Sequence, residues 1–313
     1  MATGRTFTLN DGNVIPALGL GTWQSPDKEV YEAVLTALKT GYNHIDAAFC
    51  YGNEVPVGKA IKDSGVPREN IFLTSKLWRT GHTRVTEDLK VSLKNLGVEY
   101  LDLYLMHWPV TLNPNGNHPL FPTTSTGARD LLPDEEWNYI NTWASMQELL
   151  KTGKVKSIGV SNFSAYHFEQ LLKAPATIIV PAVNQIEIHL YNPQEKLVTY
   201  CKEKGIHLTA YSPLGSTAAP LQQEAIVKTI AEKVGRSPAQ VLISWAIWRG
   251  THLVSYSKVG HPWPCREQLR GFIMSDADGQ LINEISKTTR KRIVTPNWSV
   301  KIFYDDDIAV AMR

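Results

Sequence analysis

The sequence predicts an α/β protein folded as a (β/α)8 barrel, also called a TIM barrel. Short apolar segments alternate with amphipathic helical segments at an interval of roughly 30 to 40 residues, which is typical of successive βα units. We count eight such apolar segments. Several are almost continuously apolar, such as Leu101–Met106, as expected for strands of a parallel sheet that is buried on both faces.

The predicted strands are spread over most of the chain, so we expect residues 1–313 to form one barrel domain. Their predicted bounds are Ala17–Thr22, His44–Ala47, Ile71–Leu77, Leu101–His107, Lys156–Ser161, Ala182–Ile188, His207–Ser212 and His252–Tyr256. The segment after the first strand, Lys28–Leu38, repeats apolar residues at helical spacing and has Ser25 or Asp27 as its predicted N-cap.

Residues 6–16 predict a β-hairpin ahead of the barrel, because two short apolar runs flank an Asp11-Gly12 turn. Two long segments lack a regular pattern: residues 111–132 and the tail 289–313. Long loops in compact domains are usually functional, so we expect both at the C-terminal face, with residues 111–132 as a substrate loop. We interpret the Asp305-Asp306-Asp307 run in the tail as solvated surface rather than a metal site.

The overall charge gives no sign of a polyanionic partner. The chain has 32 basic and 30 acidic residues, a formal net charge of +2, which argues against nucleic acid or membrane binding. Cys50, Cys201 and Cys265 are far apart and odd in number, which favours a reducing compartment. The N-terminus lacks the pattern of a signal peptide, so we expect a cytoplasmic monomer that acts on a small molecule.

Four polar side chains stand at or after predicted strand ends, where the active sites of such barrels lie. Asp46, Lys76 and His107 close the second, third and fourth predicted strands, and Tyr51 follows in the loop after Asp46. Each has an ordinary structural explanation when taken singly: a helix cap, a solvated lysine, a core histidine and a packing aromatic. Together they form a set with complementary chemistry.

That chemistry is the reduction of a carbonyl group. Hydride addition leaves negative charge on the carbonyl oxygen, which then needs a proton donor. Tyr51 is the candidate general acid; we expect the ammonium of Lys76 to lower its pKa and Asp46 to keep that ammonium charged. His107 is expected to orient the carbonyl oxygen by a hydrogen bond.

Longer motifs resemble the aldo-keto reductases. Gly41-Tyr42-Asn43-His44-Ile45-Asp46-Ala47-Ala48 is similar to the family's first signature, and Leu105-Met106-His107-Trp108-Pro109 to its site on the fourth strand. Gly159-Val160-Ser161-Asn162-Phe163 and Asn184-Gln185-Ile186-Glu187-Ile188-His189 extend the resemblance over nearly the whole chain. Gly19-Leu20-Gly21-Thr22-Trp23-Gln24-Ser25 most resembles yeast and fungal members that act on glyceraldehyde and related small carbonyls.

The resemblance implies a catalytic tetrad of Asp46, Tyr51, Lys76 and His107, with NADPH or NADP+ as cofactor. It implies nicotinamide contacts from Ser161, Asn162 and Gln185, a stacking ring from Tyr211, and a pyrophosphate loop that begins at Ser212-Pro213-Leu214-Gly215. The further cofactor-binding residues implied are Thr22, Trp23 and Ser216. The aromatic residues that correspond to the family's substrate pocket, beside His107, are Trp23, Trp78, Trp108 and Trp298.

The eighth predicted strand departs from the family pattern. The family motif there binds the adenosine 2′-phosphate with a Lys-Ser pair and a following Arg, whereas this chain has Ser257-Lys258 in the reverse order. Arg266 and Arg270 lie further along than the family spacing. These four residues still supply the charges and hydroxyl that a phosphate needs, so we expect NADPH, with NADH as the alternative.

Two other functions remain open from the sequence. One is a barrel that binds a dinucleotide without useful turnover, and the other is an aldolase with Lys76 as the Schiff-base lysine. No glycine-rich fingerprint follows a strand and precedes a helix, which argues against the commoner Rossmann dehydrogenases.

Overall fold

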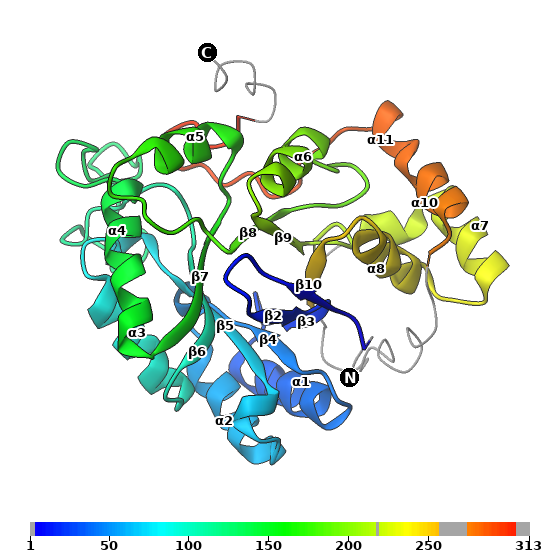
Figure 1. Cartoon of the computed structure of the whole chain (residues 1–313), viewed down its shortest axis with the longest axis horizontal. Helices are drawn as coiled ribbons and strands as arrows, with labels where there is room; N and C mark the ends of the chain where they lie inside the picture. The colour runs from blue at the N-terminus through cyan, green and yellow to red at the C-terminus, as the bar shows by residue number, and fades with distance from the viewer. Residues whose placement is uncertain (1–3, 217–218, 257–273, 305–313) are drawn as a thin grey trace.

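The computed structural model describes residues 4–216, 219–256 and 274–304. Eight parallel strands form a closed barrel with helices around it, which confirms the predicted fold class (Figure 1). In spatial order the strands are β10 (His252–Tyr256), β3 (Leu18–Gly21), β4 (His44–Asp46), β5 (Phe72–Leu77), β6 (Leu101–Met106), β7 (Val155–Ser161), β8 (Val183–Glu187) and β9 (His207–Tyr211). Pairing of β10 with both β3 and β9 closes the barrel.

The helices surround the barrel, and apolar residues of most of them pack into the same core as the strands. In α1, for example, Val30, Val34 and Leu38 are buried at helical spacing. The described helices are α1 (Asp27–Lys39), α2 (Glu54–Ser64), α3 (Val85–Leu96), α4 (Tyr139–Leu149), α5 (Ala165–Lys173), α6 (Glu195–Glu203), α7 (Ala225–Val234), α8 (Pro238–Trp248), α10 (Asp276–Asn283) and α11 (Ile285–Thr288).

The predicted N-cap of α1 is wrong. Pro26 occupies the N-cap position with φ −57° and ψ 154°, and Asp27 is the first helical residue. No side chain caps this end, because proline already holds the extended backbone that starts the helix and Asp27 contributes its negative charge to the first turn.

The N-terminal hairpin covers the bottom of the barrel, where the strands begin (Figure 1). It pairs β1 (Thr6–Thr8) with β2 (Val14–Pro16), within the range that the sequence predicts. Phe7 packs on His207, which stacks on His252 with ring centroids 5.2 Å apart. The ring centroids of His44 and His252 are 5.6 Å apart. His44, His207 and His252, each at the start of a strand, therefore form a cluster beneath the barrel interior.

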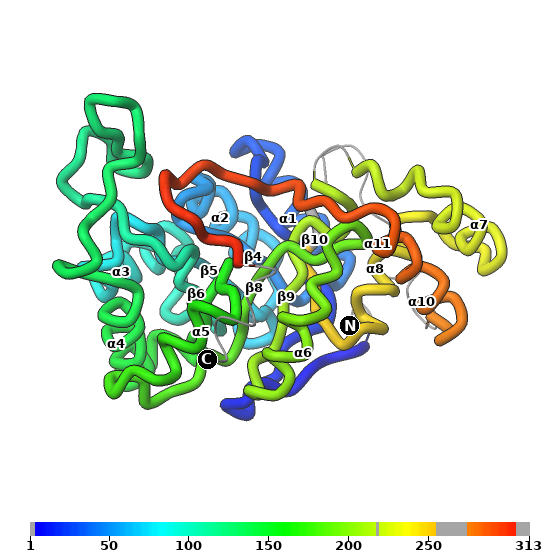
Figure 2. Tube along the Cα trace, turned by 90° about the horizontal axis from the view of Figure 1, so that it is seen from above, coloured from blue at the N-terminus to red at the C-terminus, as the bar shows by residue number. Residues whose placement is uncertain are grey.

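The opposite face is covered by the loop 111–132 and the tail 289–304, which lie on the far side of the barrel from the hairpin (Figure 2). The loop folds back on itself through the bridges Leu112–Leu131 and Thr123–Arg129. The Arg129 backbone N–H donates to Ser299 Oγ at 2.9 Å, which joins the loop to the tail. The loop and the tail are therefore joined to each other at the C-terminal end of the barrel.

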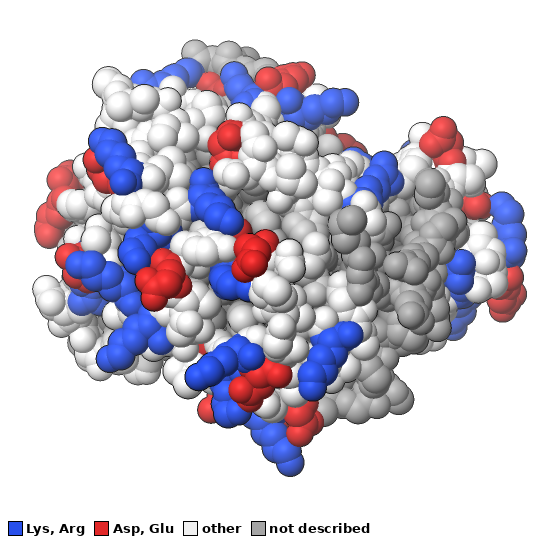
Figure 3. Space-filling model, turned by 60° about the horizontal axis from the view of Figure 1, so that its bottom comes forward, with Lys and Arg blue, Asp and Glu red and all other residues white. Residues whose placement is uncertain are grey.

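The outer surface carries charges of both signs. On the face in Figure 3, lysine and arginine side chains are interspersed with aspartate and glutamate. Within the described ranges, no helix has the length and apolar character required to cross a membrane.

Candidate active site

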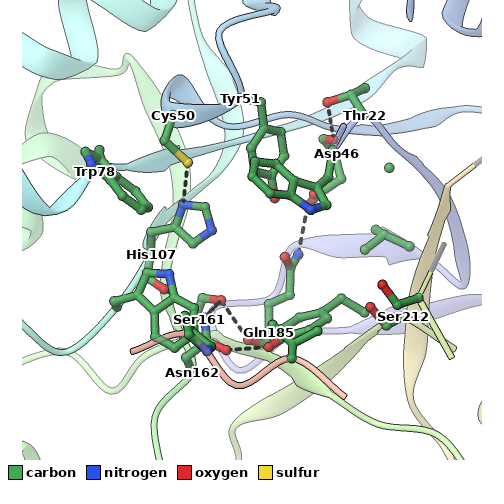
Figure 4. Close-up of a pocket in the computed structure, with 18 of the residues that line it drawn as sticks. Thr22, Asp46, Cys50, Tyr51, Trp78, His107, Ser161, Asn162, Gln185 and Ser212 are labelled. Carbon is green, nitrogen blue, oxygen red and sulfur yellow. Dashed lines mark hydrogen bonds between the residues drawn. The ribbon is translucent and has the colours of Figure 1, made fainter. Parts of the chain in front are cut away.

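The side chains predicted to carry the chemistry meet at the C-terminal end of the barrel, and Figure 4 shows three of them, Asp46, Tyr51 and His107. Asp46 ends β4, Lys76 lies one residue before the end of β5, and His107 directly follows β6. Tyr51 ends the short 3-10 helix η1 (Phe49–Tyr51) that follows β4. Because β4 pairs with β5 and β5 with β6, their ends share one edge and bring the four residues together.

Lys76 lies at the centre of this group. Its Nζ donates to Asp46 Oδ1 at 2.5 Å, to the Ala47 carbonyl oxygen at 2.8 Å and to Tyr51 Oη at 3.4 Å. Lys76 is 0% exposed and Asp46 is 2% exposed, so water screens this ion pair little. The ammonium group has three hydrogens, and these contacts use all of them.

The pKa of Tyr51 is shifted upwards in this structure, and not downwards as the sequence predicts. Burial of the phenol raises the pKa of Tyr51 well above its usual value, and the negative charge of Asp46 raises it further. The positive charge of Lys76 does not reverse this shift in the pKa of Tyr51. Lys76 Nζ lies closer to Asp46 than to Tyr51, and the Asp46 carboxylate offsets its charge. Tyr51 therefore holds its proton at neutral pH.

His107 is a neutral imidazole at the cavity wall. Burial and the positive charge of Lys76 lower the pKa of His107 well below its usual value. A neutral imidazole has one N–H donor and one acceptor nitrogen. Its Nδ1 lies 3.6 Å from Cys50 Sγ (Figure 4), and burial raises the pKa of the Cys50 thiol, which keeps its own hydrogen. A thiol that donates to Nδ1 would leave the hydrogen of His107 on Nε2.

The residues implied as nicotinamide contacts lie at the ends of the next strands. Ser161 ends β7, Asn162 follows it, Gln185 lies in β8 and Tyr211 ends β9. Ser161 Oγ donates to the Gln185 carbonyl oxygen at 2.7 Å, and Tyr211 Oη donates to Asn162 Oδ1 at 2.8 Å. Gln185 Nε2 donates to Asp46 Oδ2 at 2.8 Å, which links this set directly to the four catalytic candidates.

The remaining cofactor candidates border the same space. Thr22, Trp23, Ser212, Leu214 and Ser216 all line the cavity. Ser212 and Ser216 have φ angles of 53° and 64°, in the left-handed region that residues other than glycine seldom adopt. Such strained backbone is frequent at ligand sites.

The cavity has a volume of about 670 Å³, and aromatic side chains form part of its wall. Trp78, Trp108 and Trp298 pack against one another, with the Trp298 ring 5.2 Å from that of Trp108 and 6.1 Å from that of Trp78. Trp23 is 48% exposed and stands at the rim beside Tyr51, their rings 4.8 Å apart. All the tryptophans that the sequence implies for a substrate pocket thus line one cavity.

Three residues at or around the site were missed from the sequence. Asn53 donates from Nδ2 to the carbonyl oxygens of Thr22 and Ser25 and so holds the loop after β3. The buried Glu187 at the end of β8 accepts the backbone N–H groups of residues 293 and 294 and fixes the tail over the cavity. Arg129 lines the cavity from the loop 111–132. Of the three, only Glu187 could have been identified from the sequence, because it is a carboxylate at the end of a strand.

Some predicted positions lie outside the described residues. They are Ser257, Lys258, Arg266 and Arg270, together with the aspartate run 305–307. The 2′-phosphate assignment and the interpretation of the aspartate run therefore remain predictions.

The fold and the cavity together define an oxidoreductase built on a (β/α)8 barrel and acting on carbonyl groups. Comparison with known proteins agrees: the model of the aldo/keto reductase family matches residues 17–262. The chain belongs to the aldo/keto reductase family.

Individual relatives cover almost the whole chain. Glycerol 2-dehydrogenase (NADP(+)) of Saccharomyces cerevisiae is 49% identical over 94% of this chain and 95% of its own length. D-galacturonate reductase of Hypocrea jecorina is 47% identical over 96% of this chain and 98% of its own length. Among solved structures, the aldose reductase from Schistosoma japonicum superposes with a TM-score of 0.86 at 38% identity, covering 93% of this chain and 94% of that chain.

Proposed function

We propose that this protein reduces aldehydes and ketones to alcohols with NADPH, and catalyses the reverse oxidation, using Tyr51 as the general acid. The observation that carries the proposal is the buried Lys76, which bonds Asp46 on one side and the Tyr51 hydroxyl on the other. Two relatives named after related activities, one of them with NADP(+) in its name, support the same reaction and cofactor.

The residues present fit a nicotinamide. Its carboxamide needs both a donor and an acceptor, and the side-chain amides of Asn162 and Gln185 carry both beside the Ser161 hydroxyl. The Tyr211 ring lies on the same cavity wall and offers a face for stacking. When bound, the reduced nicotinamide supplies the hydride.

The protein's own residues manage the proton. Tyr51, a neutral phenol, donates its hydrogen to the carbonyl oxygen as negative charge develops there. The Lys76 ammonium then stabilises the phenolate that remains, and Asp46 keeps Lys76 oriented towards it. His107 directs its Nε2 hydrogen at the same oxygen and fixes the orientation of the substrate.

The aldolase alternative has little support from this geometry. A Schiff-base lysine must reach the substrate carbonyl with a free amine. Lys76 Nζ is instead buried and bonded to three oxygens, and Lys76 is not among the residues that line the cavity.

The test is Tyr51→Phe with a small aldehyde and NADPH. We expect kcat to fall by about 1,000-fold or more, because the proton donor is lost, with the NADPH dissociation constant unchanged within about threefold. Tyr104→Phe is the matched control, since Tyr104 is fully buried in β6 and its hydroxyl has no partner among the described residues. Turnover by Tyr51→Phe at the rate of the wild type would refute the assignment.

The cofactor is tested separately by titrating NADPH and NADH into the wild-type protein. We expect tighter binding of NADPH because Lys258, Arg266 and Arg270 supply positive charge for a 2′-phosphate. Equal affinities would show that this segment does not bind the phosphate.

A further inference from the structure

One wall of the cavity carries an arginine that no carboxylate pairs with in the described part of the chain. Arg129, on the loop 111–132, is the only lysine or arginine among the described residues that line the cavity. Its Nη1 donates to the Phe121 carbonyl oxygen at 3.2 Å, and its guanidinium lies over the rings of Phe121 and Trp298. In the described part of the chain, no carboxylate forms an ion pair with Arg129.

A second guanidinium lies behind this wall. Arg79 is 0% exposed, and its Cζ is 3.9 Å from the centroid of the Trp298 ring. Its Nε donates to the Val110 carbonyl oxygen, whereas Nη1 and Nη2 have no partner among the described residues. Burial lowers the pKa of Arg79 to about 9, and the positive charge of Arg129 contributes to this shift. The two guanidinium groups thus add to one another's potential around Trp298.

None of the nearby described carboxylates forms an ion pair with Arg129. Asp46 is the only carboxylate among the described residues of the lining, and it is already bound by Lys76 and Gln185. Asp130, next in sequence to Arg129, instead accepts the side-chain amide of Asn113 at 3.0 Å. A partly desolvated arginine gains most from a carboxylate, which its planar fork binds in a bidentate manner. The cavity therefore presents a charge that matches an anionic ligand.

We propose that the cavity selects carbonyl substrates that bear a carboxylate remote from the carbonyl group, and that Arg129 binds this carboxylate. This inference rests on the proposed function, because the carbonyl end must reach Tyr51. The rings of Trp298 and Phe121, which also line the cavity, flank Arg129 and provide an apolar contact for the rest of the substrate. Arg79 strengthens the attraction through its charge without touching the ligand.

The test compares 4-carboxybenzaldehyde with its neutral analogue methyl 4-formylbenzoate, each reduced by the wild type and by Arg129→Met. The two aldehydes differ in intrinsic reactivity, so the decisive quantity is the change that the substitution causes for each. We expect kcat/KM for the acid to fall about tenfold or more, mainly through KM, because the substitution removes an ion pair with the substrate. The value for the ester should stay within about twofold. Arg129→Lys should recover part of the loss, since it restores the charge without the fork.

Arg290→Met is the control for loss of one positive charge elsewhere. Arg290 is exposed and pairs with Glu195 on the surface. We expect both substrates to be reduced by this variant as by the wild type. If Arg129→Met weakened the acid and the ester equally, the arginine would have only a structural role and the inference would be overturned. An unchanged kcat/KM for the acid would place its carboxylate elsewhere, for instance at Tyr51 and His107, and would overturn it too.

A binding measurement separates this inference from the reductase function. The affinity of 4-carboxybenzaldehyde for wild type and Arg129→Met is measured by tryptophan fluorescence at low and high salt, without turnover. We expect wild-type affinity to fall with added salt and the variant to bind about tenfold more weakly at low salt. If neither aldehyde were reduced but this difference held, the proposed function would fail while the carboxylate site stood. If the ester were reduced but wild type and Arg129→Met bound the acid equally well, the proposed reductase function would stand and the carboxylate site would fail.

Discussion

The buried pair of Asp46 and Lys76 allows a quantitative test of the site, in which Asp46→Asn removes one charge and keeps the shape. The pair is 2.5 Å apart, with side-chain exposures of 3% for Asp46 and 0% for Lys76. Loss of one partner of such a buried ion pair leaves an uncompensated charge and typically costs about 3–5 kcal/mol. In the native protein, Gln185 Nε2 donates a hydrogen bond to Asp46 Oδ2. Asparagine places its own N–H group at that position, so two donors face each other and the hydrogen bond is lost.

The double variant Asp46→Asn, Lys76→Met gives the result that distinguishes charge from packing. It removes both charges, and replacing a buried ion pair by uncharged side chains of similar size is often close to neutral. We therefore expect the double variant to be at least about 2 kcal/mol more stable than Asp46→Asn alone, although neither turns over aldehydes.

The assay is urea unfolding at pH 7.5, followed by tryptophan fluorescence and circular dichroism. Agreement of the two probes is needed before a free energy is taken from the midpoints. A double variant that loses as much stability as the two single variants combined would show that the contacts of Lys76 stabilise the barrel irrespective of charge. The electrostatic account of the site would then be wrong.

Two further predictions concern the barrel. Burial lowers the pKa of His44 from 6.5 to about 4, so the unfolded chain takes up its proton first and stability falls as the pH drops from about 6.5 towards 4. Of the roughly 3 kcal/mol that this one histidine contributes in full, about 2 kcal/mol should be lost between pH 7 and pH 5, read from the urea midpoints; no decline there, or the same decline in His44→Leu, would contradict it. Gly58→Ala should cost about 3 kcal/mol, because its Cβ would clash with the backbone carbonyl of Leu96 between α2 and α3. Gly65→Ala is the control, with φ +69° and open space around its Cβ, and should cost only about 1 kcal/mol; an equal loss in both would disprove the clash.

The barrel itself was predictable because strand and helix periodicity is a local property that every residue of a segment helps to encode. All eight predicted strands are present, with bounds that agree to within one residue at each end. The place of Asp46, Lys76 and His107 followed from the same logic, since parallel strands direct their C-terminal ends to one edge. The N-cap of α1 was mispredicted because Ser25 and Asp27 are both good caps by residue type, and the backbone geometry of Pro26 decided between them.

The sequence by itself determined the barrel, its hairpin and which side chains reach the catalytic end. Only the tertiary structure decided the pKa of Tyr51, because that value is a balance between burial and charges at distances that no spacing in the chain reveals. The same holds for the wall around Trp298, where Arg79 and Arg129 meet a residue of the tail. Contacts between segments so far apart in the chain arise from how the loops fold over the barrel, and periodic patterns carry no information about that packing.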